Sequence, residues 1–190
     1  MTEHRHVRAL VGAEWRDGAG TFPATSPGSG EVFATIEEGD AALADAAVRA
    51  AAGAAAGWAR VAPAERAAHL HEIERLVGAQ REELAVLLTR DQGKPLEAEA
   101  AFDEVDELAE YFSMAAEDAK RTAGAIPPSV TSGRRVLVQR VPLGVVGVVS
   151  PWNWPYTMGA EVFAPAMAAG NTVVGSQPPA RARAPGSWQS

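Results

Sequence analysis

The alternation of apolar and polar positions divides the chain into three parts, and the first part consists of short strands and turns. β-Compatible residues occupy positions 7–10 and 31–36. Between them, positions 25–30 read TSPGSG, in which proline fixes φ and glycine permits a positive φ, as turns require. We therefore predict two short strands separated by a turn.

Three helices are predicted in the middle of the chain. The first spans about 41–58, with Asp40 as its N-cap, because a carboxylate there can accept from backbone N–H groups of the first turn. The second spans about 63–93 and carries leucine, isoleucine and valine at helical spacing. The third spans about 96–121, and its acidic run 103–110 is interpreted as a solvated face opposite an apolar one.

The last part alternates strand, helix and strand. Strands are predicted at 134–141 and 143–149, and the second is almost continuously apolar, as is typical of a parallel strand covered on both faces. A helix over 155–169 and a short strand over 172–174 follow. This order begins a nucleotide-binding sheet. The predicted fold class is therefore α/β, with an incomplete Rossmann-like domain preceded by helices and short strands.

The predicted elements divide the chain into four segments. Residues 1–39 hold the N-terminal strands and turns. Residues 40–133 form a helical part that packs on the nucleotide-binding domain, and residues 134–174 contribute a strand and the start of the Rossmann-like sheet. Residues 175–190 are a tail rich in Ala, Arg, Pro, Gly, Ser and Gln, a composition that suits neither a helix nor a strand.

Composition narrows the possible functions. Of the 190 residues, 47% are hydrophobic, and abundant alanine predicts a core of small side chains on closely packed helices. A net charge of −7 without a basic block argues against nucleic acid or an anionic membrane as a partner. The absence of cysteine excludes disulfides, thiolate metal sites and a cysteine nucleophile within these residues. With neither a signal peptide nor an apolar run of roughly 20 residues, a cytoplasmic location is expected.

The loop after the apolar strand carries the best candidate for chemistry. Positions 150–155 read Ser-Pro-Trp-Asn-Trp-Pro and follow the carboxyl end of a strand, where open α/β sheets bind ligands. The two prolines restrict the backbone, so Asn153 can present its amide in a fixed direction and stabilise an oxyanion. The alternative is that prolines and tryptophans only shape the corner between strand and helix.

Other candidate residues carry weaker signals. His69 and His71 lie two positions apart on a predicted helix, so they point to different faces and are unsuited to hold one metal ion together. The segment Gly93-Lys94-Pro95 lacks the spacing of a phosphate-binding loop and is interpreted as a helix junction. We therefore predict no metal site.

The block PLGVVGVVSPWNWP, followed by FAPAMAAGNTVV, resembles the aldehyde dehydrogenase superfamily. ERAAHL and REELAVLLTRDQGKPLEAEA precede it in the family's order, so the resemblance covers about residues 8–174. It implies an NAD(P)-dependent oxidation of an aldehyde to an acid, with Asn153 in the position of the oxyanion-stabilising asparagine. The resemblance also implies which residues contact NAD or NADP. Five consecutive residues would line the nicotinamide-ribose side of the cofactor cleft: Val149, Ser150, Pro151, Trp152 and Asn153.

The sequence departs from the family after residue 174. A lysine-bearing segment that holds the adenosine ribose is replaced by Gly175-Ser176-Gln177-Pro178. The family's glycine loop, general-base glutamate and cysteine nucleophile do not occur in these 190 residues. Our hypothesis for this change is a shifted reading frame, and the alternative is a natural linker. The resemblance therefore implies an N-terminal fragment that is inactive by itself and binds NAD or NADP very weakly.

Two functions stay open from the sequence. The first is the N-terminal part of an aldehyde dehydrogenase, with an aldehyde as substrate. The second is a non-catalytic fragment that docks with a separate C-terminal half or with intact subunits, because an unfinished sheet leaves an apolar edge. The same reasoning predicts that the helices over 41–121 cover the sheet on one side only. We also expect the isolated chain to self-associate.

Overall fold

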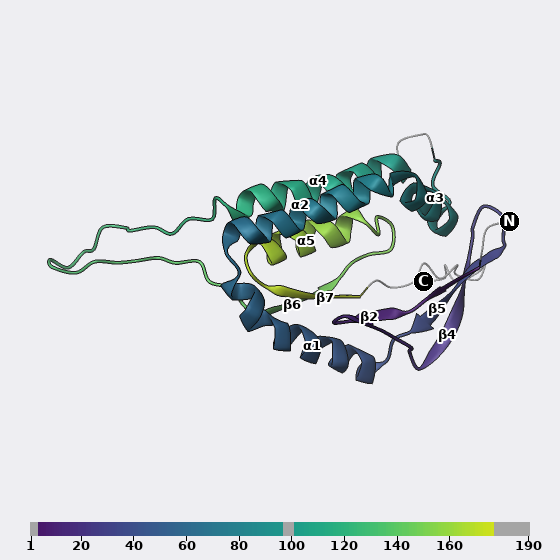
Figure 1. The fold of residues 1–190 in the computed structure, drawn as a ribbon, viewed down its shortest axis with the longest axis horizontal. Coiled ribbons are helices and arrows are strands. Elements are labelled where there is room, and N and C mark those ends of the chain that lie inside the picture. Colours follow the sequence, from purple (N-terminus) through teal and green to yellow (C-terminus); the bar gives the residue numbers. More distant parts are fainter. Residues whose placement is uncertain (1–3, 97–100, 177–190) are drawn as a thin grey trace, which may run out of the picture.

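The computed structural model describes residues 4–96 and 101–176, which surround a small parallel sheet (Figure 1). This sheet consists of β6 (Val145–Val149) and β7 (Thr172–Ser176). The helices are α1 (Ala41–Arg60), α2 (Pro63–Ala79), α3 (Arg81–Gln92), α4 (Ala101–Ala119) and α5 (Thr157–Ala168). The N-terminal strands are β1 (Arg5–Val7), β2 (Ala9–Val11), β3 (Glu14–Arg16), β4 (Gly20–Thr25) and β5 (Val32–Glu38).

The N-terminal strands form two sheets, and the predicted strand at 7–10 is divided between them. The chain leaves β1 at Arg8 and enters β2, which pairs with β3 in an antiparallel hairpin. In the other sheet, β5 lies between β1, which is parallel to it, and β4, which is antiparallel. The turn predicted at 25–30 is confirmed, and Gly30 there adopts a φ of 75°. These strands lie beside the parallel sheet (Figure 1).

The first helix agrees with its prediction, whereas the second does not. Asp40 caps α1, because its side chain accepts a hydrogen bond of 2.7 Å from the N–H of Leu43. The prediction of a single helix over 63–93 is wrong, because the helix is interrupted at Gln80, where φ is −110° and ψ is 15°. Gly78 lies just before the break and lowers the helix propensity there. The break separates α2 from α3.

The third predicted helix corresponds to α4. It ends at Ala119, slightly before the predicted end at 121. The predicted start near residue 96 adjoins residues 97–100, which lie outside the described residues.

The parallel pairing of β6 and β7 confirms the interpretation of the apolar run. Its register sets Val145 opposite Thr172 and Val149 opposite Ser176. α5 connects the strands and packs on one face, while α1 packs on the other (Figure 1). The prediction that the preceding helices cover one side only agrees with α1, which contacts both strands on one face. α2 and α4 instead pack on α5, and α5 itself covers the second face, so both faces of the apolar strands are covered.

Asn171 connects the end of α5 to the start of β6. Its Oδ1 accepts hydrogen bonds from the N–H groups of Leu143 at 2.6 Å and Gly144 at 3.0 Å. Its Nδ2 donates to the carbonyl of Ala166 at 3.0 Å. The side chain is buried, so these backbone groups depend on it for their hydrogen bonds.

The strand predicted at 134–141 is wrong. Residues 120–144 form a long extension from the body of the protein (Figure 1). One isolated bridge crosses it, in which Ala125 and Val138 exchange hydrogen bonds of 2.9 and 2.8 Å. A strand needs a partner for its remaining backbone groups, and the described residues supply none beyond this bridge.

Alanine dominates the core, as the composition predicts. One buried cluster joins α2, α4 and α5 around Leu70 and Phe112. Its small members are Ala67, Ala115, Ala116, Ala119, Ala160, Ala164 and Ala168. A second cluster joins α3 to α4 around Leu88 and Val105. None of the helices in the described ranges is long and apolar enough to cross a lipid bilayer.

Replacing Asn171 should destabilise the unit formed by β6, α5 and β7. We expect Asn171→Ala to lower the free energy of unfolding by at least about 2 kcal/mol, because it leaves buried backbone groups without partners. Urea denaturation followed by circular dichroism measures this change. The exposed amide variant Gln139→Ala is the control and should change stability by less than about 0.5 kcal/mol. Equal stability of the two variants would contradict the role assigned to Asn171.

Candidate functional site

The predicted loop lies at the carboxyl end of β6, beside the end of β7. Ser150 donates its N–H to the carbonyl of the last β7 residue at 3.2 Å, which continues the pairing of the strands. Ser150 is 6% exposed, whereas Val149 is 82% and Trp152 is 56% exposed. Pro151 and Asn153 are exposed as well. The expected site residues thus lie together at one edge of the sheet, and most of them face outward.

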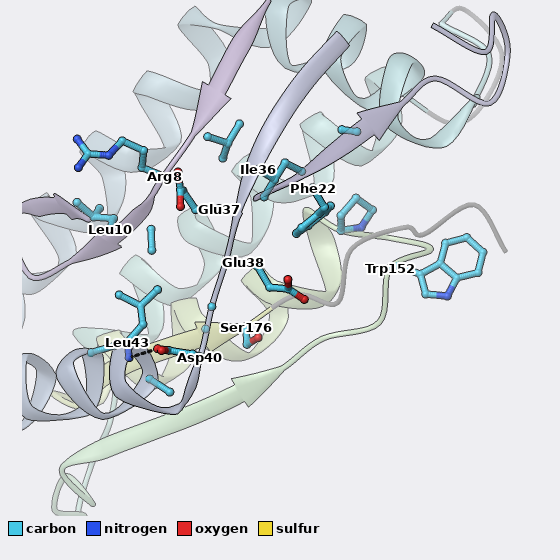
Figure 2. A pocket seen from close by; sticks show the side chains of 18 of the residues that line it. Arg8, Leu10, Phe22, Ile36, Glu37, Glu38, Asp40, Leu43, Trp152 and Ser176 are labelled. Atoms are coloured by element: carbon cyan, nitrogen blue, oxygen red, sulfur yellow. Dashed lines mark hydrogen bonds between the residues drawn. The ribbon is translucent and has the colours of Figure 1, made fainter. Parts of the chain in front are cut away.

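A cleft of about 1000 Å³ lies beside this edge (Figure 2). Its walls are residues 7–11, β4, β5, the first two turns of α1, the end of α3, the loop and the end of β7. Trp152 and Pro155 line it from the loop, and Ser176 lines it from β7. The other expected site residues do not line it: Val149, Ser150, Pro151 and Asn153.

α4 holds the second half of the loop through a buried carboxylate. Glu104 has no exposed surface, and its Oε1 accepts a hydrogen bond of 2.8 Å from the N–H of Tyr156. Its Oε2 accepts from Nζ of Lys94 at 2.5 Å. The same ammonium lies 4.0 Å from the centre of the Trp154 ring, in a cation–π geometry. Glu104 and Lys94 therefore bind the loop at two points.

Glu104 corrects the prediction that the whole acidic run 103–110 is a solvated face. The other acids of the run are exposed, but Glu104 faces the protein interior. It lies three residues after Ala101 and four before Leu108, which places it on the apolar side of the helix. This spacing is the signal in the sequence that identifies it. Lys94 carries no comparable signal, because its partners are distant in the chain.

Tyr156 is fixed by a second hydrogen bond. Its hydroxyl donates to the carbonyl of Leu84 on α3 at 3.2 Å. Burial, with smaller effects of the Glu104 and Asp91 carboxylates, raises the pKa of Tyr156 to about 12. The phenol therefore keeps its proton at neutral pH and serves as a donor that anchors the loop.

Asn153 is exposed and makes no hydrogen bond with the residues that the structure describes. The chain is anchored on both sides of it, by Ser150 toward the strand and by Trp154 toward the helix. The backbone that carries this amide is therefore held in place, and the amide N–H₂ is open to a bound ligand. The arrangement can therefore stabilise negative charge that develops on an oxygen bound next to this amide.

The described residues fit one end of a nicotinamide dinucleotide and not its pyrophosphate. Trp152 and Pro155, with the amide of Asn153, offer the apolar surface and the polar group that suit a nicotinamide and its ribose. Arg8 in the cleft lining is already paired with Asp17 at 2.6 Å. A negatively charged pyrophosphate is disfavoured there, because the lining also carries Glu37, Glu38, Asp40 and Asp91.

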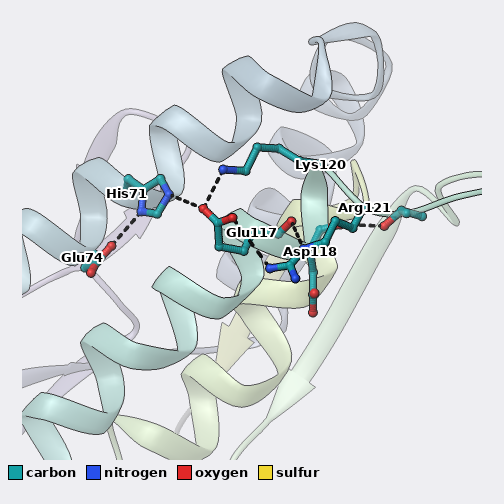
Figure 3. Close-up of polar contacts among 7 residues, drawn as sticks. His71, Glu74, Glu117, Asp118, Lys120 and Arg121 are labelled. Carbon is teal, nitrogen blue, oxygen red and sulfur yellow. Dashed lines mark hydrogen bonds and ion pairs between the residues drawn. The ribbon is translucent and has the colours of Figure 1, made fainter.

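A second polar cluster joins α2 to α4 away from the loop (Figure 3). His71 contacts Glu74 at 2.8 Å and Glu117 at 3.3 Å, and Lys120 contacts Glu117 at 2.6 Å. The hydrogen bond with Glu74 raises the pKa of His71 above its ordinary value, an effect that outweighs the opposing effect of burial. This partly exposed cluster of ion pairs connects α2 to the end of α4.

His69 and His71 face different elements, as predicted. The ring centre of His69 lies 5.8 Å from that of Trp58 on α1, whereas His71 faces α4. Within residues 4–96 and 101–176, no group of three or more His, Asp or Glu side chains is arranged to hold a metal ion.

The chain is similar in sequence and in structure to aldehyde dehydrogenases. The aldehyde dehydrogenase family model matches residues 15–182. A mitochondrial succinate-semialdehyde dehydrogenase from Oryza sativa subsp. japonica is 36% identical over 170 residues, which are 88% of this chain and 32% of that protein. Succinate-semialdehyde dehydrogenase from Burkholderia pseudomallei superposes with a TM-score of 0.86 at 36% identity, covering 90% of this chain and 36% of that one. PnpE in complex with nicotinamide adenine dinucleotide gives 0.85 at 31% identity, with 90% and 35% covered.

The chain thus spans about a third of the length of the curated relatives that it matches, 32% for the rice protein. The match to the family extends to residue 182, beyond the boundary predicted at 174. Residues 177–190 lie outside the described ranges. The separate tail over 175–190 stays a prediction.

Stability should depend on pH through His71. Its pKa in the folded protein is raised above 6.5, so protonated His71 stabilises the fold below that value, and the contribution is lost as pH rises through the folded pKa. Because the side chain is partly exposed, we expect a loss of a few tenths of a kcal/mol between about pH 6 and about pH 8. Urea denaturation across this range measures it.

The matched variants for this prediction are His71→Gln and His69→Gln. The first should remove the decline, whereas the second should retain it, because His69 contacts neither Glu74 nor Glu117. An identical decline in His71→Gln and the unchanged protein would show that His71 is not the group responsible.

Proposed function

The chain belongs to the aldehyde dehydrogenase family, and on this premise we propose that it forms the N-terminal part of an enzyme that oxidises an aldehyde to a carboxylic acid. The family uses NAD or NADP, and we propose the same cofactors here. The observation that carries this proposal is the exposed amide of Asn153, on a loop anchored on both sides at the carboxyl edge of the sheet. The proposed location is the cytoplasm.

In this proposal, Asn153 stabilises charge on the aldehyde oxygen. Attack of a thiolate on the carbonyl carbon turns the carbonyl oxygen into an oxyanion, and Nδ2–H of Asn153 donates to it. The thiolate comes from outside these 190 residues, because they contain no cysteine. The cofactor, when bound, supplies the acceptor for the hydride. The residues of this chain orient the amide and keep its loop from relaxing.

We propose that Val149, Ser150, Pro151, Trp152 and Asn153 contact the nicotinamide-ribose side of the cofactor. The position of Trp152 in the lining of the cleft supports this assignment. The carboxylates of the same lining oppose a pyrophosphate, so cofactor binding by the 190 residues alone should be very weak. Without a nucleophile, they should also be inactive by themselves.

A second candidate function is that of a non-catalytic docking fragment, and exposed apolar surface favours it. A groove of about 360 Å³ lies between α1 and β7, lined by Trp58, Met167 and Val173 among others. Within the described residues, β7 pairs with β6 on one side and has no strand on the other. Such an edge pairs readily with another strand. The proposed partner is a separate C-terminal part of an aldehyde dehydrogenase, or an intact subunit.

The catalytic proposal predicts activity by complementation. Co-expression with the C-terminal remainder of an aldehyde dehydrogenase should give aldehyde-dependent formation of NADH or NADPH, which absorbance detects. In that complex, Asn153→Ala should lower kcat about 10²- to 10³-fold, because the oxyanion loses a donor. Gln139→Ala is the control and should leave kcat unchanged.

Two outcomes would contradict this proposal in different ways. Aldehyde-dependent NAD⁺ reduction by the purified 190-residue chain would show that the site is already complete. A wild-type kcat for Asn153→Ala in an active complex would remove the oxyanion role from that residue.

The docking proposal predicts association. The purified chain should sediment as a dimer or larger species, and the C-terminal partner should convert it to a mixed complex of defined mass. Apolar side chains that β7 and α1 expose in the groove become covered in that complex. A monomer with a sharp, reversible thermal transition that fails to co-purify with the partner would exclude this function.

A further inference from the structure

We propose that Lys94 and Glu104 are positioning residues for the loop that carries Asn153, a role that rests on the proposed function and deepens it. Neither residue lines the cleft beside the loop. Lys94 instead contacts Trp154, and Glu104 contacts Tyr156 at the junction of the loop with α5. The pair therefore acts on the amide of Asn153 through the backbone that presents it.

The direction of Lys94 is set by the end of α3. Gly93 terminates this helix with a φ of 73°, and its N–H donates to the carbonyl of Thr89 at 2.8 Å. A side chain at this position would be strained, and its Cβ would lie 3.0 Å from the ring of Pro27. The turn at Gly93 carries Lys94 toward α4 and the loop.

The ion pair lies inside the protein and contacts the loop directly. The side chain of Lys94 is 16% exposed and that of Glu104 is 0% exposed, so each charge depends on the other for compensation. One oxygen of Glu104 accepts from Lys94, and the other accepts from the N–H of Tyr156. A hydrogen bond to an ionised acceptor is stronger than one to a neutral acceptor. The start of α5 is thereby held against α4.

The lysine also fixes the residue next to Asn153. Its ammonium lies 4.0 Å from the centre of the Trp154 ring, and the carbonyl of Trp154 accepts from the N–H of Met158 in the first turn of α5 at 3.1 Å. The ring and the carbonyl of Trp154 are therefore both held in place. Because Trp154 follows Asn153 directly, a shift of Trp154 moves the amide of Asn153.

One double variant distinguishes a positioning role of the ion pair from a purely structural role. Lys94→Met with Glu104→Gln removes both charges, keeps similar volumes and leaves an amide oxygen that can accept from Tyr156. Replacing a buried ion pair by well-packed hydrophobic groups of similar size is often neutral for stability. The glutamine at position 104 adds an amide N–H₂ without an acceptor, which costs some stability but leaves no buried charge. The double variant should therefore fold with a modest loss of stability, while Trp154 loses its cation.

A matched control pair joins α3 to α4. Arg81 on α3 contacts Asp106 on α4 at 2.5 and 2.6 Å, and the guanidinium lies 4.3 Å from the centre of the Phe102 ring. This pair combines an ion pair with a cation–π contact, as Lys94 and Glu104 do, but it is exposed and its partners all lie on α3 and α4. The control variant is Arg81→Met with Asp106→Asn.

The first readout is ¹⁹F NMR of the 190-residue chain labelled with 5-fluorotryptophan, with the Trp154 signal assigned by Trp154→Phe. We expect the signal to move in the Lys94→Met/Glu104→Gln variant, while far-UV circular dichroism stays as in the unchanged protein and urea unfolding stays cooperative. The Arg81→Met/Asp106→Asn control should leave the signal in place. An unmoved Trp154 signal in the folded double variant overturns the proposal.

The second readout is catalysis in the complemented enzyme. We expect the double variant to lower kcat at least about tenfold with KM changed less than about twofold, because misplacing the amide weakens transition-state binding alone. Unchanged kcat overturns the proposal. An inactive complex of the unchanged chain overturns the proposed function instead, and the NMR readout still decides the positioning role.

A conservative variant tests the proposal if the double variant does not fold. Lys94→Arg retains a cation beside Trp154 and a partner for Glu104, so the Trp154 signal should stay near its original position. Lys94→Met alone would leave the buried Glu104 charge without a partner, so the second variant is Trp154→Leu, which keeps the ion pair and removes the ring that the ammonium contacts. It should lower kcat of the complemented enzyme at least about tenfold. Equal kcat in Trp154→Leu, Lys94→Arg and the unchanged enzyme overturns the proposal.

Discussion

The geometry of the site depends on one buried carboxylate. Glu104 has no exposed surface, and it accepts from the side chain of Lys94 and from the backbone N–H of Tyr156. Losing one partner of a buried charge typically costs about 3–5 kcal/mol, so α4, the end of α3 and the loop have to pack together. Three segments of the chain thereby become one unit. The exposed amide of Asn153 is presented from that unit.

The parallel pair β6 and β7 determines where this unit lies. Parallel strands need a crossover, and α5 supplies it, so the loop before α5 and the end of β7 meet at one edge of the sheet. Asn171 fastens the other end of the crossover to the start of β6. Asn153 at the open edge is suited to an oxyanion, and the carboxylates of the adjoining cleft are unsuited to a pyrophosphate. The proposed division follows: these residues contribute the oxyanion donor, and other residues contribute the nucleophile and the phosphate site.

Local patterns predicted most of the elements, and the errors over 134–141 and at Glu104 arose where a residue depends on a partner elsewhere in the chain. The cap at Asp40 and the apolar strand within 143–149 follow from local chemistry, and both are confirmed. The strand at 134–141 has suitable residues but lacks a partner strand in the described ranges. Glu104 lies among solvated acids in the sequence, yet its spacing places it in the core, where Lys94 and the loop surround it. The site's place in the fold was thus predictable, and the contacts that hold it were not.

Amide hydrogen exchange at Tyr156, followed by NMR in the 190-residue chain, tests most directly whether α4 holds the loop. Its N–H donates to a fully buried carboxylate, so it should exchange as slowly as the amides in the middle of α4. The amide of the exposed Trp152 should exchange much faster. Exchange of Tyr156 at the rate of Trp152 would show that the loop opens independently of the helix, and Glu104 would then not organise the site.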